Sequence, residues 1–110
     1  MTGRGIGEIG PAAAAARLGA PGVVFLDVRE PGEHAVASID GALLVPMREI
    51  PGRLSELDRS SEIVVFCHHG GRSAMVAQFL RGQGFDRVLN LTGGIDGWSL
   101  EVDPEVPRYR

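Results

Sequence analysis

The fold is decided by residues 63–73, which read Ile-Val-Val-Phe-Cys-His-His-Gly-Gly-Arg-Ser. Four large apolar residues in a row, ending at Phe66, are typical of a short strand that is buried on both faces. Cys67 follows at once, and two glycines lead to a segment with helical periodicity at 73–81. The stretch therefore predicts a strand, a tight turn and a helix, with a cysteine at the junction.

The alternation of strand and helix continues on both sides of this stretch. Besides 63–66, compact apolar runs bounded by turn-forming residues predict strands over 23–28, 43–45 and 88–91. Helices are predicted over 31–36, 50–57, 73–81 and 94–98, with a short one over the alanine run 12–16, which follows Pro11 and ends near Gly19. Strands that alternate with helices indicate an α/β fold, in which helices flank a central, mostly parallel sheet.

Length and composition indicate a single domain. The chain has 110 residues, of which 44% are hydrophobic, and this is enough to bury one ordinary core. We expect the core to span about residues 7–100. The last ten residues, 101–110, hold two prolines and five charges, so we expect an extended tail that lies on the domain or leaves it.

The charged residues exclude several classes of function. With 14 acidic and 11 basic residues the net charge is -3, so nucleic acid is not an expected partner. All 11 cations are arginine, which excludes a phosphate-loop lysine, a Schiff-base lysine and a lysine general base. No apolar run approaches the roughly 18 residues that cross a bilayer, so no membrane partner is expected. One cysteine cannot form an internal disulfide, and we expect a reducing, cytoplasmic location.

Cys67 lies at the carboxyl end of a predicted strand, where open α/β sheets bind their ligands. Gly70 and Gly71 adopt positive φ at low cost, so the turn can direct successive backbone N–H groups at the sulfur. The helix that begins near Ser73 adds free amides and the positive end of its dipole. Such surroundings favour the nucleophilic thiolate and would also stabilise a persulfide anion. A buried structural thiol, the commoner fate of a free cysteine, needs none of these features.

The whole set of motifs resembles the rhodanese family. The segment from Cys67 to Ser73 is similar to its active-site loop, and three further elements follow the family's order: Leu26-Asp27-Val28-Arg29-Glu30 with Glu33; Ile39, Gly41-Ala42 and Pro46; and Gly93-Gly94-Ile95-Asp96-Gly97-Trp98. The sequence departs from the family's usual residues at His34, at Ala37-Ser38 and at Gly97, all outside the cysteine loop. The resemblance implies a rhodanese-like three-layer fold and a sulfurtransferase. Such an enzyme moves sulfane sulfur from thiosulfate or a persulfide donor through a Cys67 persulfide to a thiophilic acceptor.

The resemblance also implies roles for individual residues. Cys67 is the expected catalytic residue, and the expected substrate-binding residues are the rest of the loop: His68, His69, Gly70, Gly71, Arg72 and Ser73. Arg72 has two interpretations, a contact to the substrate anion or an ion pair with Asp27, Glu30 or Glu33, and the resemblance favours the ion pair. Structural support is expected from Asp27, Arg29 and Glu33.

The paired histidines raise the question of a metal site. Adjacent residues on a tight loop are expected to diverge, and His34 is the only other histidine, so we expect no zinc site and no cofactor. We interpret His68 and His69 as rim residues that influence substrate preference.

Two other functions compete with sulfur transfer. Cell-cycle dual-specificity phosphatases share the rhodanese fold, but their loop is one residue longer than this one, which has four residues between Cys67 and Arg72. The shorter loop crowds a tetrahedral phosphate. A non-catalytic binding or sensing module is the other alternative, although such a module has no need of the cysteine, the glycines or the helix start.

The tail bears on possible partners. Residues 101–109 resemble the ending of rhodanese modules joined to adenylyltransferases that activate ubiquitin-like sulfur carriers. The resemblance to the rhodanese family implies a small-molecule sulfur donor such as thiosulfate as one partner, and the tail adds a ubiquitin-like sulfur-carrier protein as a candidate acceptor. The alternative is that the two prolines and alternating apolar residues strap the tail across the domain surface.

Overall fold

The computed structural model describes residues 7–110. Within them, five strands form one sheet in the order β1-β5-β4-β2-β3, and every neighbouring pair is parallel. The strands are β1 (Gly7–Ile9), β2 (Val23–Asp27), β3 (Leu43–Leu44), β4 (Glu62–Phe66) and β5 (Val88–Leu91). The prediction of an α/β fold with a mostly parallel sheet is confirmed.

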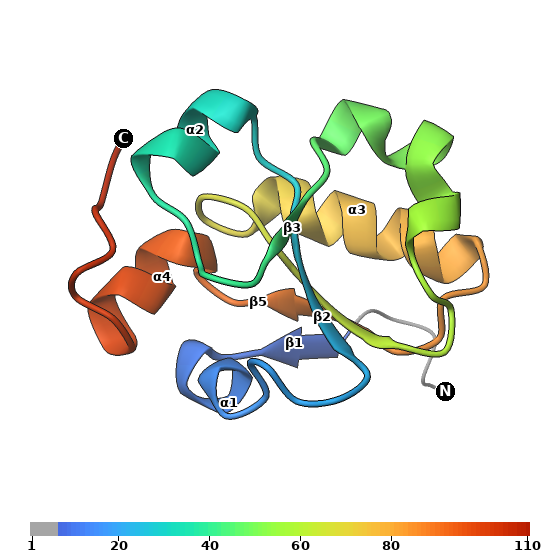
Figure 1. Cartoon of the computed structure of the whole chain (residues 1–110), viewed down its shortest axis with the longest axis horizontal. Helices are drawn as coiled ribbons and strands as arrows, with labels where there is room; N and C mark the ends of the chain where they lie inside the picture. Colours follow the sequence, from blue (N-terminus) through green and yellow to red (C-terminus); the bar gives the residue numbers. More distant parts are fainter. Residues whose placement is uncertain (1–6) are drawn as a thin grey trace.

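Helices cover both faces of the sheet (Figure 1). In chain order they are α1 (Pro11–Ala15), α2 (Pro31–Val36), the 3-10 segment η1 (Met47–Glu56), α3 (Gly71–Gly82) and α4 (Gly94–Glu101). α3 and η1 pack on one face, whereas α1 and α4 pack together on the other. The result is the three-layer arrangement expected from the sequence.

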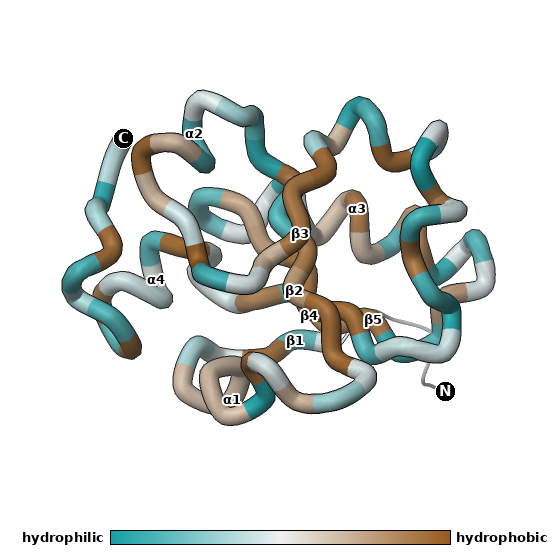
Figure 2. The backbone as a smooth tube through the Cα atoms, viewed as in Figure 1, coloured by the Kyte–Doolittle hydropathy of each residue, from teal (hydrophilic) through white to brown (hydrophobic). Residues whose placement is uncertain are grey.

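The alternating side chains of β4 divide the core in two. Ile63 and Val65 join the apolar cluster beneath α3 and η1, whereas Val64 and Phe66 join the cluster beneath α1 and α4. Figure 2 shows β2 and β4 largely in the brown of hydrophobic residues. The alternation continues past the strand end, because Cys67 belongs to the same cluster as Ile63 and Val65. Its side chain is therefore placed on the α3 side of the sheet.

The helix predicted over 50–57 is wrong in type and in its limits. The chain instead forms 3-10 turns over Met47–Glu56, with non-helical backbone angles at Arg53 (φ -125°, ψ 20°). Pro51 lies inside this segment and has no N–H to donate, so a continuous α-helix cannot pass through it. The sequence analysis also missed β1, which is only three residues long and begins with a glycine.

Other differences concern the ends of elements. α3 begins at Gly71, two residues before the predicted start, so Arg72 and Ser73 lie in its first turn. α4 continues to Glu101, past the predicted end at residue 98. Among residues 7–110, no helix is long and apolar enough to cross a membrane.

The tail turns back onto the domain after α4, and its end lies beside α2 in Figure 1. Val106 is buried in the cluster beneath α1 and α4. The Ser99 hydroxyl donates a hydrogen bond to the Val106 carbonyl at 2.6 Å. Of the two arrangements expected for the tail, the structure shows the one in which it lies on the domain.

Candidate active site around Cys67

Three hydrogen-bond donors converge on the sulfur of Cys67. The Gly70 N–H lies 3.1 Å from Sγ, the Ser73 N–H lies 3.4 Å away and the Ser73 hydroxyl 3.3 Å away. Gly70 adopts φ +119°, a conformation that glycine reaches without a steric penalty, and the chain turns there into α3, which places Ser73 beside the cysteine. Ser73 lies in the first turn of α3, where backbone N–H groups have no partner within the helix. This arrangement suits a sulfur that carries negative charge.

The start of α4 holds the cysteine loop from behind. The Ile95 N–H donates to the Cys67 carbonyl at 2.9 Å, and the Asp96 N–H donates to the His68 carbonyl at 3.1 Å. Gly94 makes this close approach possible, since a Cβ there would lie 2.5 Å from the Cys67 carbonyl oxygen. Because the C=O and N–H of one peptide point in opposite directions, these bonds also fix the direction of the following N–H groups.

Asn90, a residue missed by the sequence analysis, sits beneath the loop on β5. Its Oδ1 lies 2.5 Å from the Ser73 hydroxyl and its Nδ2 lies 3.3 Å from the Gly70 carbonyl. The single hydroxyl proton of Ser73 thus has three acceptors in reach: the Asn90 amide oxygen, the Cys67 sulfur and the Gly70 carbonyl. A polar residue in the otherwise apolar run 88–91 was the available signal.

Asp27 and Arg29 form a buried ion pair behind the site. Both side chains are fully buried, and the Arg29 Nε and Nη2 donate to the two Asp27 carboxylate oxygens at 2.9 and 2.6 Å. Nη2 also donates to the Ala37 carbonyl at 2.7 Å. His34, one of the departures from the family pattern, places Nδ1 3.1 Å from Asp27 Oδ2. The pair joins the end of β2 to α2.

Arg72 pairs with Glu33, one of the three carboxylates considered for it. Nη1 and Nη2 donate to the two carboxylate oxygens of Glu33 at 2.7 and 2.8 Å. Glu33 belongs to α2, where it also receives the Glu30 N–H in a capping box. Hydrogen bonding from Arg72 lowers the pKa of Glu33 from its ordinary value of 4.5 to about 2, against the opposing effect of burial. The bidentate pair ties the first turn of α3 to α2.

This pKa shift predicts a loss of stability in acid that depends on Glu33. A carboxyl whose pKa is lowered in the folded state stabilises the fold above its unfolded pKa, and that stability is lost as the pH falls from about 5 towards 2. Urea unfolding at several pH values should therefore show a shallower acid dependence for Glu33→Gln than for the wild type. Exposed Glu105→Gln is the control variant. Equal acid dependence in wild type and Glu33→Gln would contradict the prediction.

His68 and His69 do not diverge, so that expectation was wrong. Their rings stack with centroids 3.9 Å apart and planes 26° apart, and Tyr109 stacks on the other side of His68 at 3.9 Å and 10°. The tail supplies this second flat surface, so the His68 ring is stacked between the rings of Tyr109 and His69. Within the described part of the chain, residues 7–110, no three His, Cys, Asp or Glu side chains are grouped as a metal site would require.

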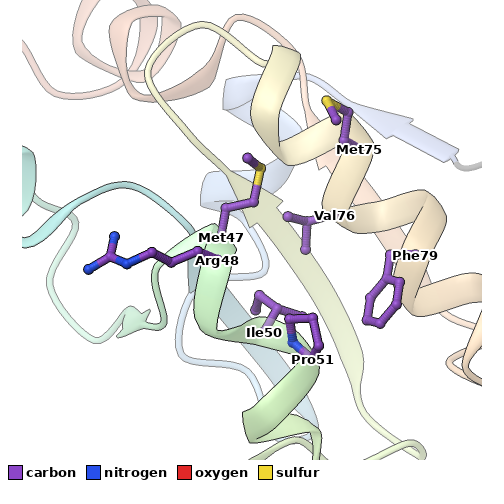
Figure 3. Close-up of a pocket in the computed structure, with 7 residues that line it drawn as sticks. All are labelled: Met47, Arg48, Ile50, Pro51, Met75, Val76 and Phe79. Atoms are coloured by element: carbon purple, nitrogen blue, oxygen red, sulfur yellow. The ribbon is translucent and has the colours of Figure 1, made fainter.

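An apolar groove of about 260 Å³ lies between η1 and α3. Met47, Ile50 and Pro51 line one side and Met75, Val76 and Phe79 the other, while Arg48 points away from α3 (Figure 3). The groove contains no nucleophile. The cradle around Cys67 is therefore the better candidate for covalent chemistry.

The structure is an α/β protein with a parallel sheet, and its candidate active site is a cysteine that lies between a strand and a helix. The Rhodanese-like domain family matches residues 10–101, and the chain therefore belongs to that family. A crystal structure of a rhodanese-like domain protein from Staphylococcus aureus superimposes with a TM-score of 0.81 and 28% identity, covering 96% of this chain and all of that one.

Curated relatives agree with this family. A protein from Allochromatium vinosum named sulfurtransferase is 42% identical, covering 76% of this chain and 78% of its own. Thiosulfate sulfurtransferase GlpE of Actinobacillus pleuropneumoniae is 35% identical, covering 93% of this chain and 94% of its own. Rhodanese-like/PpiC domain-containing protein 12 of Arabidopsis thaliana is 44% identical over 77% of this chain, which spans only 30% of that longer protein.

Proposed function

We propose that this protein is a rhodanese-type sulfurtransferase that carries sulfur on Cys67. The observation that carries the proposal is the convergence of three donors, from Gly70 and Ser73, on a single sulfur atom. The names of the relatives support sulfur transfer as the reaction class. Thiosulfate is the proposed donor, because a relative that matches nearly the whole chain is named thiosulfate sulfurtransferase.

The reaction consists of two displacements. The Cys67 thiolate attacks the outer sulfur of thiosulfate, the S–S bond of the donor breaks, and sulfite leaves with the bonding electron pair. A nucleophilic acceptor such as cyanide then attacks the terminal sulfur of the persulfide, and the thiolate departs as thiocyanate forms. The site holds negative sulfur before and after each step, so N–H donors that are fixed in advance stabilise every charged species.

Other residues of the site have proposed supporting roles. His68, His69 and Gly71 form the rim of the loop, where they would meet the donor anion. Arg72 is proposed to act through Glu33, because both of its terminal nitrogens are bonded to that carboxylate. A ubiquitin-like sulfur carrier remains a proposed acceptor. Its support is the resemblance of the tail alone, and packing on the domain accounts for the same residues.

Intact mass spectrometry tests the proposal. Incubation with thiosulfate should add the mass of one sulfur atom, and cyanide should remove it with release of thiocyanate. Initial rates with both substrates varied should show ping-pong kinetics. A protein that gains no sulfur and forms no thiocyanate would favour the binding module, whereas hydrolysis of an aryl phosphate without sulfur transfer would favour the phosphatase.

A further inference from the structure

The end of the tail touches the cysteine loop and the residues that hold it. Arg108 forms two hydrogen bonds to Asp96, at 2.8 and 3.1 Å, and the Asp96 N–H binds the His68 carbonyl. The Tyr109 ring stacks on His68, the residue next to the cysteine. Figure 1 shows the tail running from α4 to the side of α2.

The Tyr109 hydroxyl joins the side chain of Arg29 to the side chain of Glu33. It accepts a hydrogen bond from Arg29 Nη1 at 2.9 Å and donates one to Glu33 Oε2 at 2.8 Å. Glu33 in turn binds Arg72. Arg29 is buried and fixed by Asp27, so it provides a rigid anchor for this hydroxyl.

Tyr109 therefore contacts one end of the loop directly and reaches the other end through Glu33. The ring restrains His68, at the start of the turn, and the hydroxyl restrains Arg72 through Glu33, at the start of α3. The donors that reach the sulfur belong to Gly70 and Ser73, which lie between and just beyond these two points. A shift at either end would move those donors away from the sulfur.

We propose that Tyr109 is a positioning residue for sulfur transfer, a role that rests on the proposed function. It acts through His68 and Glu33 to hold the cysteine loop in the arrangement that directs its N–H groups at the sulfur. The tail would then contribute to the active site in addition to covering the apolar cluster in which Val106 is buried.

Two substitutions separate the ring from the hydroxyl. Tyr109→Phe keeps the stacking surface and removes the bridge, so kcat for thiosulfate and cyanide should fall by roughly 10- to 150-fold, as expected for loss of a hydrogen bond to a charged group. Tyr109→Ala removes both contacts, and kcat should fall by a further factor of about 3 to 10, the scale of a lost ring pair. The KM for thiosulfate should change less than kcat, because the rim residues that meet the anion are retained.

Two controls separate positioning from general stability. Leu57→Ala removes a buried side chain distant in sequence from the tail, so it should lower Tm without lowering kcat at a temperature where the protein stays folded. Hydrogen exchange reports on the loop directly. The Gly70 and Ser73 amides should exchange about 10-fold faster or more in Tyr109→Ala, whereas in Leu57→Ala they should change no more than the other core amides.

These measurements distinguish failure of the proposed function from failure of the positioning role of Tyr109. Wild-type protein that forms no persulfide overturns the proposed function, and amide exchange then still decides whether Tyr109 holds the loop. Active wild type with unchanged kcat and unchanged Gly70 and Ser73 exchange in both tyrosine variants overturns the positioning role. A fall in kcat that the loss of folded protein fully accounts for, as expected of a variant that is only destabilised, overturns it as well.

Discussion

The Cys67→Ser protein is expected to fold normally and to lose sulfur transfer, with turnover reduced by roughly 10⁴- to 10⁶-fold, the scale on which loss of an enzyme nucleophile acts. Serine fits the cavity, and its oxygen can accept the Gly70 and Ser73 N–H groups that the sulfur accepts in the wild type. A hydroxyl is not ionised near neutral pH without a base beside it, and it cannot carry sulfane sulfur. Thiocyanate formation and intact mass after incubation with thiosulfate are the measurements.

The composition makes this test unusually clear. Cys67 is the only cysteine among 110 residues, so no second thiol can accept sulfur in its place. The thermal unfolding temperature and the far-UV circular dichroism of Cys67→Ser serve as the folding control. Thiosulfate turnover or a gain of one sulfur atom by a well-folded Cys67→Ser protein would end the proposal.

The strand, turn and helix around Cys67 could be predicted because the signals that determine them are local. A buried strand needs only a short apolar run, and Gly70 supplies the one positive φ that the turn requires. The buried face of α3 also fits the helical periodicity of 73–81, since Val76, Ala77 and Leu80, which share one helix face, are all buried. Short elements carried weaker signals. β1 has three residues, and proline within η1 disrupts a pattern that otherwise looks helical.

The parts of the site that could not be predicted depend on contacts between distant segments. Glu33 and Arg72 are 39 residues apart, and the sequence offered three carboxylates with no means of choosing among them. Tyr109 is 80 residues from Arg29, so its bridging position follows from the folding of the tail and from no local pattern. Asn90 gave a signal, as a polar residue in an apolar strand, but its partners Ser73 and Gly70 are set by the register of β5 beside β4.

The second large effect is expected at Gly94, where alanine should destabilise the protein and disable the loop together. Gly94 has φ +60°, which costs a residue with a Cβ about 1–2 kcal/mol. The added Cβ would also lie 2.5 Å from the Cys67 carbonyl oxygen, and overpacking of this kind costs roughly 1–3 kcal/mol. The sum is about 2–5 kcal/mol, so Tm should fall by roughly 10–30 °C for a domain of this size.

Gly97→Ala, in the same helix, is the matched control. A Cβ there would lie 3.4 Å from its nearest neighbour, the Thr92 carbonyl oxygen, which is ordinary contact. Alanine also favours helix over glycine by up to about 1 kcal/mol, so Gly97→Ala should keep or raise Tm and retain turnover. In Gly94→Ala the Cys67 and His68 carbonyls must move away from α4, and the donors that follow them in the loop must move too. Sulfur transfer should therefore fall even at a temperature where Gly94→Ala remains folded. If Gly94→Ala instead has the same Tm and the same turnover as the wild type, α4 does not hold the loop.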